Sequence, residues 1–249
     1  MRTSSAGARP RSRAVAVPCD GLRLAGRLFL PAGEPHGALL VCHGAGSRKE
    51  NHAIMGEQAA AAGLAALTFD FRGHGESEGV MDPDGWRDAV AAGDVLLAES
   101  GAPWLAARGA SMGGMLLLLA AHAKPDFFSS LVLLCPADGA SLLAGLDELE
   151  SGGEADAQGR EYTGRFDAQS LRPFLRGLDL VAAARGLPRV LLAHARDDGS
   201  VPFAHSERLA AVLAPPSRFI RLDRGGHHGP GRSPHVARAT IDWVRAHGG

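Results

Sequence analysis

The residues best suited to do chemistry are a serine, two aspartates and two histidines, each placed shortly after an apolar run that predicts a buried strand. Ser111 lies in the segment Gly109-Ala110-Ser111-Met112-Gly113, between one such strand and an apolar helix. This G-x-S-x-G pattern is typical of a nucleophilic serine in a strained turn, where the glycines let the strand and helix backbones approach closely. We therefore expect the Ser111 hydroxyl to be presented at a helix N-terminus, where backbone N–H groups can stabilise an oxyanion.

The second requirement is a carboxylate, because a serine hydroxyl is a weak nucleophile at neutral pH and needs a histidine base that an acid orients. With this turn, the three residues follow one another along the chain in the order serine, acid, histidine. Asp197 and Asp198 follow the apolar run 189–193, which places them in a loop at the carboxyl edge of the predicted sheet. Both aspartates are candidates for the orienting acid.

The candidate base lies in the glycine-rich loop Gly225-Gly226-His227-His228-Gly229, after the last predicted strand. We favour His227, and His228 is the alternative because a shift of one residue would exchange which ring points inward. A zinc site formed by His227, His228 and His235 is disfavoured, since adjacent histidines on a glycine loop lack the spacing that makes ligands converge. We therefore expect no metal and no cofactor.

Two backbone N–H groups are expected to form the oxyanion hole. The segment His43-Gly44-Ala45-Gly46 follows the apolar run 38–42, and its glycines free the backbone to face the nucleophile. We predict that Ala45 N–H and Met112 N–H are the two donors, and that the His43 side chain is structural. The polar loop 70–77 is expected to brace the site without joining the chemistry.

The order of the predicted elements indicates a mostly parallel sheet. A β-hairpin is expected from Ala14 to Leu30, and a Ser47…Glu50 capping box is expected to begin a helix over residues 51–62. Strands then alternate with helices to the last helix, predicted over residues 234–246. This alternation predicts an α/β fold with helices on both faces of the sheet and ligands at the carboxyl ends of the strands.

The chain of 249 residues is long enough for one large domain, which we place at residues 14–249. The arginine-rich residues 1–13 are expected to form a disordered tail. Residues 137–188 separate two predicted sheet strands and include the acidic, glycine-rich segment 151–159, so they are expected to form a lid-like insertion.

The composition argues against several classes of function. Its 26 basic and 27 acidic residues leave a net charge of −1, which offers no broad surface for nucleic acid. The three cysteines are widely spaced and indicate neither disulfides nor a zinc site. No signal-peptide pattern or apolar run long enough to span a membrane is present, so we expect a cytoplasmic protein without membrane insertion.

Taken together, these motifs resemble the α/β-hydrolase superfamily over residues 14 to 247. The segments HGAGSRKENH (43–52), FDFRGHGESEG (69–79), GASMGG (109–114), RDDGSVP (196–202) and GGHHG (225–229) carry the resemblance. The first two are similar to the serine aminopeptidase-like branch, which includes feruloyl esterases and monoacylglycerol lipase-like enzymes. In similar hydrolases the acid lies three residues before the valine of a Val-Pro pair, which favours Asp198 over Asp197.

The resemblance implies a serine hydrolase that cleaves small carboxylic esters without a cofactor, through the triad Ser111, His227 and Asp198. The same triad would also serve a thioesterase, a peptidase or an amidase. A noncatalytic receptor for small molecules on the same fold is a further alternative. The insertion at residues 137–188 corresponds to the region that sets substrate selectivity in similar hydrolases.

Overall fold

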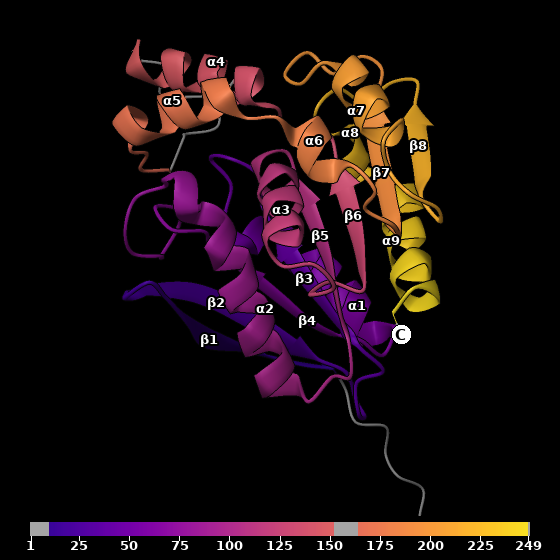
Figure 1. Ribbon diagram of the computed structural model, residues 1–249. Coiled ribbons are helices and arrows are strands. Elements are labelled where there is room, and N and C mark those ends of the chain that lie inside the picture. The colour runs from indigo at the N-terminus through magenta and orange to yellow at the C-terminus, as the bar shows by residue number, and fades with distance from the viewer. Residues whose placement is uncertain (1–9, 152–163, 249) are drawn as a thin grey trace, which may run out of the picture.

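A computed structural model describes residues 10–151 and 164–248, and its centre is an eight-stranded sheet between helices (Figure 1). The strands are β1 (Arg11–Cys19), β2 (Leu22–Leu30), β3 (Ala38–Cys42), β4 (Ala65–Phe69), β5 (Leu105–Ala110), β6 (Ser130–Leu134), β7 (Val190–Ala195) and β8 (Arg218–Leu222). The helices are η1 (Lys49–His52), α1 (Ala53–Ala61), η2 (Pro83–Gly85), α2 (Trp86–Ser100), α3 (Met112–Ala123), α4 (Gly139–Glu150), α5 (Ala168–Gly177), α6 (Leu180–Ala184), α7 (Phe203–Ala210), α8 (Gly229–Arg232) and α9 (Pro234–Ala246).

The strand order is β1-β2-β4-β3-β5-β6-β7-β8, and every pair from β4 to β8 is parallel. β3, β4, β6 and β7 are buried along their whole length, which is the pattern of parallel strands covered on both faces. The mostly parallel sheet predicted from the sequence is therefore confirmed. Its carboxyl edge collects the ends of β3, β5, β7 and β8, after which the candidate site residues lie.

The predicted boundary of the N-terminal tail at residue 13 is wrong by three residues. β1 begins at Arg11, and its register with β2 pairs Arg11 with Leu30 and Arg13 with Leu28. The hairpin has equal arms of nine residues on either side of a two-residue turn, so the exposed polar residues continue the ladder although they bury no core. Residues 1–9 lie outside the described part of the chain.

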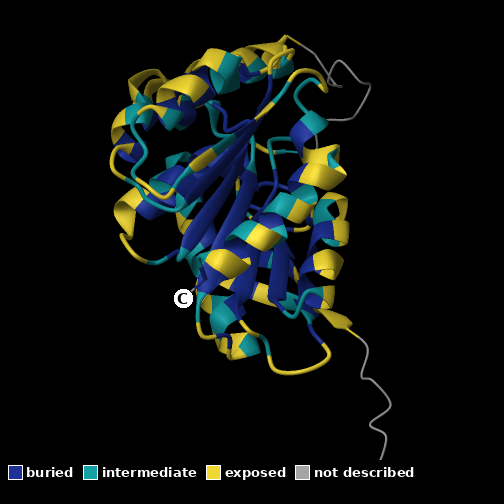
Figure 2. Cartoon of the chain, turned by 90° about the vertical axis from the view of Figure 1, so that its right-hand side faces the viewer, coloured by how far each residue is buried: buried dark blue, intermediate teal, exposed yellow. Residues whose placement is uncertain are grey.

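Helices cover the two faces of the sheet unequally. The core between the sheet and α1 with α9 contains Met55 and Val236, whereas the larger core on the other face contains residues of α2, α3, α6 and α7. Figure 2 shows the strands as buried elements between helices whose outer surfaces are exposed. The carboxyl edge of the sheet is thus rigidly held from both sides.

The predicted capping box before α1 is not formed. His52 occupies the N-cap position without a side-chain cap, and the Ser47 hydroxyl instead accepts a hydrogen bond from the Asn51 amide at 3.1 Å. Buried Asp70 holds this segment, because it accepts hydrogen bonds from the backbone N–H of Lys49 at 2.7 Å and from its ammonium at 2.8 Å. A tertiary contact therefore replaces the local capping contact.

The insertion at residues 137–188 is helical where it is described. α4 and α5 lie together beyond the carboxyl ends of the strands in Figure 1, and α6 leads back toward β7. The two helices approach closely, since a Cβ on Gly139 would lie only 2.1 Å from the carbonyl oxygen of Leu175. Most of the acidic, glycine-rich segment 151–159 lies outside the described residues. Within residues 10–151 and 164–248, no helix is long and apolar enough to cross a membrane.

Candidate active site

Ser111 lies in a strained turn between β5 and α3. Its φ of 52° and ψ of −121° form a backbone conformation that non-glycine residues rarely adopt. A Cβ on Gly109 would lie 2.5 Å from the Gly113 carbonyl oxygen, and one on Gly113 would lie 2.5 Å from that of His43. The two glycines of the motif are therefore required by close backbone contact, as the sequence pattern predicts.

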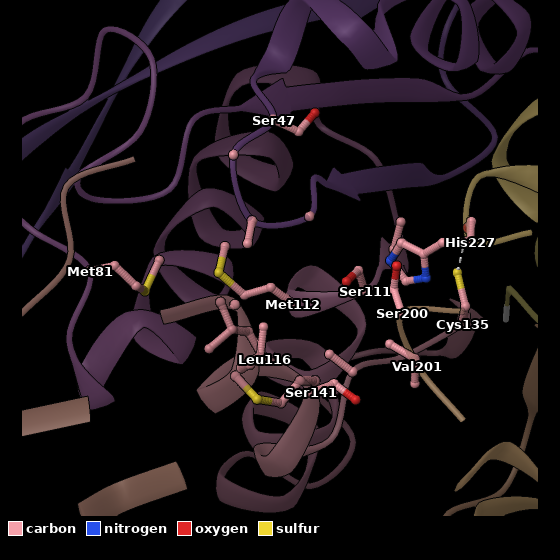
Figure 3. Close-up of a pocket in the computed structure, with 18 of the residues that line it drawn as sticks. Ser47, Met81, Ser111, Met112, Leu116, Cys135, Ser141, Ser200, Val201 and His227 are labelled. Atoms are coloured by element: carbon pink, nitrogen blue, oxygen red, sulfur yellow. Dashed lines mark hydrogen bonds between the residues drawn. The ribbon is translucent and has the colours of Figure 1, made fainter. Parts of the chain in front are cut away.

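The His227 imidazole is oriented by Asp198. Its Nδ1 donates a hydrogen bond to Asp198 Oδ2 at 2.8 Å, which leaves Nε2 as the free ring nitrogen. Ser111 and His227 line the same cavity, and Figure 3 shows both side chains in it. This arrangement brings together the three residues predicted from the sequence as nucleophile, base and acid.

Asp198 is fully buried and held by several donors. Besides His227, it accepts hydrogen bonds from His194 Nε2 at 2.9 Å and from the backbone N–H groups of Ser200 and Val201 at 2.8 and 2.9 Å. Burial alone would raise the pKa of this carboxyl, but the hydrogen bonds from His194 and His227 outweigh burial and lower the pKa below its usual value. Asp198 is therefore a fixed anion at neutral pH.

Asp197, the other candidate acid, has a different role. Its carboxylate accepts hydrogen bonds from the backbone N–H groups of Gly225 at 3.1 Å and Gly226 at 2.8 Å, which lower its pKa. Both glycines have a positive φ, so they can turn these N–H groups toward the acid. Asp197 thus holds the loop that carries His227, and His227 is the ring that is hydrogen-bonded to Asp198.

The predicted oxyanion donors face the same cavity as Ser111. A Cβ on Gly44 would lie 3.2 Å from the Ser111 Cβ, so the loop before Ala45 passes directly beside the nucleophile. Met112 is the first residue of α3, where a backbone N–H has no partner within the helix. Ala45 and Met112 both line the cavity that contains Ser111.

His43 is structural, as expected. Its ring is fully buried, and Nδ1 donates to the Gly44 carbonyl at 2.8 Å while Nε2 accepts from the Phe71 N–H at 3.0 Å. Burial lowers the pKa of His43 to about 3, so the ring stays neutral at neutral pH. Both ring nitrogens are therefore engaged in holding the loop.

The loop 70–77 braces this region. In addition to Lys49, the Asp70 carboxylate accepts from the Glu76 N–H at 3.0 Å, and the buried Arg72 guanidinium pairs with Asp88 at 2.7 Å. Burial raises the pKa of Asp88 despite that pairing. The loop links η1, α2 and β4, so it fixes the backbone that leads to the candidate oxyanion hole.

The cavity has a volume of about 740 Å³ and extends from the sheet edge to the insertion. One part is walled by apolar side chains from α3 and the insertion, among them Met115, Leu116, Leu142, Leu146, Phe174 and Leu175. Figure 3 shows Met81 and Leu116 on one side of Ser111, with Cys135 and His227 on the other. The cavity can thus hold an apolar group beside the nucleophile.

Three possible metal ligands lie close together in the described part of the chain. One ligand atom from each of Cys135, Asp198 and His227 lies within 4.8 Å of the others. His227 Nδ1 is already bonded to Asp198, and the Cys135 thiol donates to the His227 carbonyl at 3.1 Å. Burial also raises the pKa of Cys135, so its thiolate is unavailable at neutral pH. The donor set therefore fits a hydrogen-bonded triad better than a metal site.

The sequence motifs do not predict the positions of two further residues at this site. His194 donates from Nε2 to Asp198 and accepts from the Ser206 hydroxyl at Nδ1 over 2.7 Å, so it fixes the acid from the side opposite His227. Its position four residues before Asp198 could have indicated this. Arg108 lines the cavity, and no sequence motif indicates this position.

Sequence comparisons relate much of the chain to known proteins. Residues 33–146 match the family model described as serine aminopeptidase, S33. A segment of 125 residues is 30% identical to mouse monoglyceride lipase, but the match spans 48% of this chain and only 41% of that lipase. An uncharacterized protein of Mycobacterium tuberculosis is 29% identical over 232 residues, which is 91% of this chain and 76% of that protein.

Solved structures show the same fold. The structure of Est1E from Butyrivibrio proteoclasticus with ferulic acid bound superposes with a TM-score of 0.75 at 19% identity, covering 94% of this chain and 99% of that one. A putative hydrolase from Agrobacterium vitis gives a TM-score of 0.73 at 22% identity, with coverage of 96% and 99%. At these identities the likeness concerns the arrangement of the elements.

Proposed function

We propose that this chain is a serine esterase of the α/β-hydrolase superfamily that cleaves carboxylic esters through an acyl-enzyme intermediate. The match of residues 33–146 to the serine aminopeptidase model and the shared fold support this proposal. The single observation that carries the proposal is the hydrogen bond between His227 Nδ1 and buried Asp198, beside a serine in a strained turn. Such a pair exists to hold an imidazole in one tautomer and one orientation. The monoglyceride lipase relatives and the ferulic acid bound to Est1E support esters as the substrate class.

The first step is attack of Ser111 Oγ on the ester carbonyl carbon. His227 Nε2 takes the hydroxyl proton as the new C–O bond forms, and Asp198 stabilises the imidazolium that results. The carbonyl oxygen becomes an oxyanion, which the N–H groups of Ala45 and Met112 stabilise. Collapse of this intermediate breaks the bond to the alcohol, which leaves with the proton from His227.

The second step releases the acid. Water attacks the acyl group on Ser111 and gives its proton to His227 Nε2, and the serine leaves with that proton when the second tetrahedral intermediate collapses. Asp198 remains an anion throughout, consistent with its lowered pKa. The insertion at residues 137–188 acts as a lid whose apolar wall takes the hydrophobic part of the substrate.

The test is hydrolysis of 4-nitrophenyl acetate, butyrate and octanoate, with an acyl thioester and an anilide as competing bond types. We expect Ser111→Ala to lower kcat by about 10⁴- to 10⁶-fold without loss of fold, as in other serine hydrolases. Ser200→Ala is the matched control, since Ser200 lines the same cavity outside the triad. Unchanged hydrolysis in Ser111→Ala would contradict the proposal, and a wild-type preference for the anilide would replace esterase by amidase.

A further inference from the structure

Arg108, near the end of β5, is a buried cation without a counter-charge in the described part of the chain. The residue is 4% exposed, and its Nε has no hydrogen-bond partner. Burial lowers the pKa of the guanidinium to about 10, with only Cys135 acting against burial, so Arg108 is still charged at neutral pH. An unpaired buried charge is costly, and a side chain kept there at such a cost invites a ligand of opposite charge.

The position of Arg108 directs its side chain away from the apolar wall under the insertion. The register places Arg108 beside Val41 and Val132, which belong with Ala106 to the core facing α1 and α9. Residues two apart on a strand share a face, so Arg108 lies on that face with Ala106 and opposite α3. It nevertheless lines the cavity that contains Ser111.

The groups around Arg108 are polar and carry no negative charge at neutral pH. Burial and the nearby Arg108 together lower the pKa of His52 to about 4, so that ring is neutral. The Ser47 hydroxyl lies 3.5 Å from His52 Nε2, and both residues line the cavity. On the other flank, Cys135 is a neutral thiol because burial raises its pKa.

The carboxylates that line the cavity lie elsewhere. Asp82, at the N-cap of η2, already accepts hydrogen bonds from Arg72 at 3.0 and 3.2 Å. Glu148 projects from α4 in the insertion, and neither acid acts on the pKa of Arg108. The cavity therefore combines an apolar part under the insertion with a cationic part at the sheet.

We propose that Arg108 binds an anionic oxygen group of the substrate, a carboxylate or a phosphate, so that the preferred esters carry a negative charge remote from the scissile bond. A guanidinium presents a planar fork of N–H donors that matches both groups, and desolvation in a buried site strengthens the pairing. This inference rests on the proposed esterase function, because it describes the anion as part of an ester substrate. The binding of an anion beside Ser111 can nevertheless be measured without any hydrolysis.

The kinetic test compares similar esters that carry or lack an anionic group. On the acyl side, the 4-nitrophenyl monoester of adipic acid is compared with 4-nitrophenyl hexanoate. On the alcohol side, 4-acetoxybenzoate and 4-acetoxyphenyl phosphate are compared with methyl 4-acetoxybenzoate. We expect one charged ester to be preferred, and the ratio of kcat/KM for that ester to its neutral partner to fall about 10- to 100-fold in Arg108→Met. Whether the preferred ester is a carboxylate or a phosphate identifies the source of the anion.

The matched control is Arg238→Met, which removes an exposed cation of α9 outside this cavity. It should leave the ratio within twofold of wild type, whereas a general loss of positive potential would lower both variants equally. Arg108→Lys keeps the charge without the fork and should retain an intermediate ratio. If Arg108→Met does not fold, Arg108→Lys is the variant that tests the proposal. A wild-type ratio in Arg108→Lys would then contradict the binding of the anion by the guanidinium fork.

The binding test uses Ser111→Ala, in which no ester is turned over. Adipate or inorganic phosphate should raise its melting temperature and bind in calorimetry, with affinity lost about 10- to 100-fold on adding Arg108→Met. No binding of either anion, together with equal ratios in the kinetic test, would overturn the inference while leaving ester hydrolysis by Ser111 intact. Binding that depends on Arg108 in a protein that hydrolyses no ester would instead refute the proposed function alone.

Discussion

The cavity contains two regions that the chain builds in different ways. The triad region is made of loops at the carboxyl edge of the sheet, where Asp198 is fully buried and receives four hydrogen bonds. The lid region is made of α4 and α5, which contribute apolar side chains such as Leu146 and Phe174. Hydrogen bonds therefore fix the positions of the side chains in the triad region. In the lid region, the apolar surface and the shape of the cavity determine which substrates fit.

Substitutions in the triad region should therefore have large effects on kcat, and substitutions in the lid region should have graded effects on substrate preference.

The two adjacent histidines should differ strongly. His227→Ala removes the proposed base and should lower kcat for 4-nitrophenyl butyrate by about 10⁴- to 10⁶-fold. His228→Ala leaves the hydrogen bond between His227 Nδ1 and Asp198 in place, so it should lower kcat by less than about tenfold. Steady-state kinetics on both variants checks this, and equal losses would show that the base cannot be assigned to one ring.

The two adjacent aspartates should also separate. Asp198→Asn should lower kcat by about 10⁴-fold, because the amide favours the wrong tautomer of His227. Asp197→Asn retains one acceptor for the N–H groups of Gly225 and Gly226, so we expect a loss of about tenfold or less. A larger loss in Asp197→Asn than in Asp198→Asn would reverse the assignment of the acid.

The lid region should respond to chain length. Each methylene of an acyl chain that enters the apolar wall is worth about 0.8 kcal/mol, or about fourfold in kcat/KM. Phe174→Ala should reduce the gain from butyrate to octanoate by about 3- to 10-fold, measured with 4-nitrophenyl esters. Arg176→Ala, on an exposed position of α5 outside the cavity, is the control and should keep the wild-type gain. An unaltered chain-length dependence in Phe174→Ala would remove the lid from substrate selection.

The smallest effect is thermodynamic and concerns the brace beneath the triad region. Burial lowers the pKa of His43 and of His74 to about 3, well below the ordinary histidine value of about 6.5. The unfolded chain therefore binds more protons than the folded chain between pH 6.5 and about 3, so the free energy of unfolding falls as the pH falls through that range. The expected slope is at most about 1.4 kcal/mol per pH unit for each histidine.

Urea titrations at pH 7, 6, 5 and 4 measure this slope. His74→Gln removes one of the buried histidines with a lowered pKa, so the stability of this variant should fall less steeply with acid than that of the wild type. An identical slope in the two proteins would show that His74 is protonated in the folded chain.

The features of the triad region that have a local cause can be predicted from the sequence. Gly109 and Gly113 are required by close backbone contacts around Ser111. Continuous apolar runs predict the buried strands that carry the loops. The choice between Asp197 and Asp198 depends instead on contacts with Gly225, Gly226 and His227, which lie far away in the chain. Spacing alone does not contain this information.

Other features could not be predicted because tertiary contacts override local patterns. The Asp70 carboxylate accepts hydrogen bonds from the backbone N–H and the ammonium of Lys49, and the capping box expected at Ser47 does not form. The helices of the insertion pack their apolar faces against each other and line the cavity with them. The alternation of strands and helices that marks the sheet is interrupted here, so it does not indicate where these helices begin and end. Arg108 interrupts an apolar strand, and only the structure reveals that its charge is buried and without a counter-ion in the described residues.

The most direct test of the central claim is intact-protein mass spectrometry after incubation with a fluorophosphonate. An activated Ser111 predicts a single adduct on the wild type, none on Ser111→Ala, and strongly slowed labelling of His227→Ala. An adduct that persists on Ser111→Ala, or no adduct on well-folded wild type, would contradict the assignment of Ser111 as an activated nucleophile.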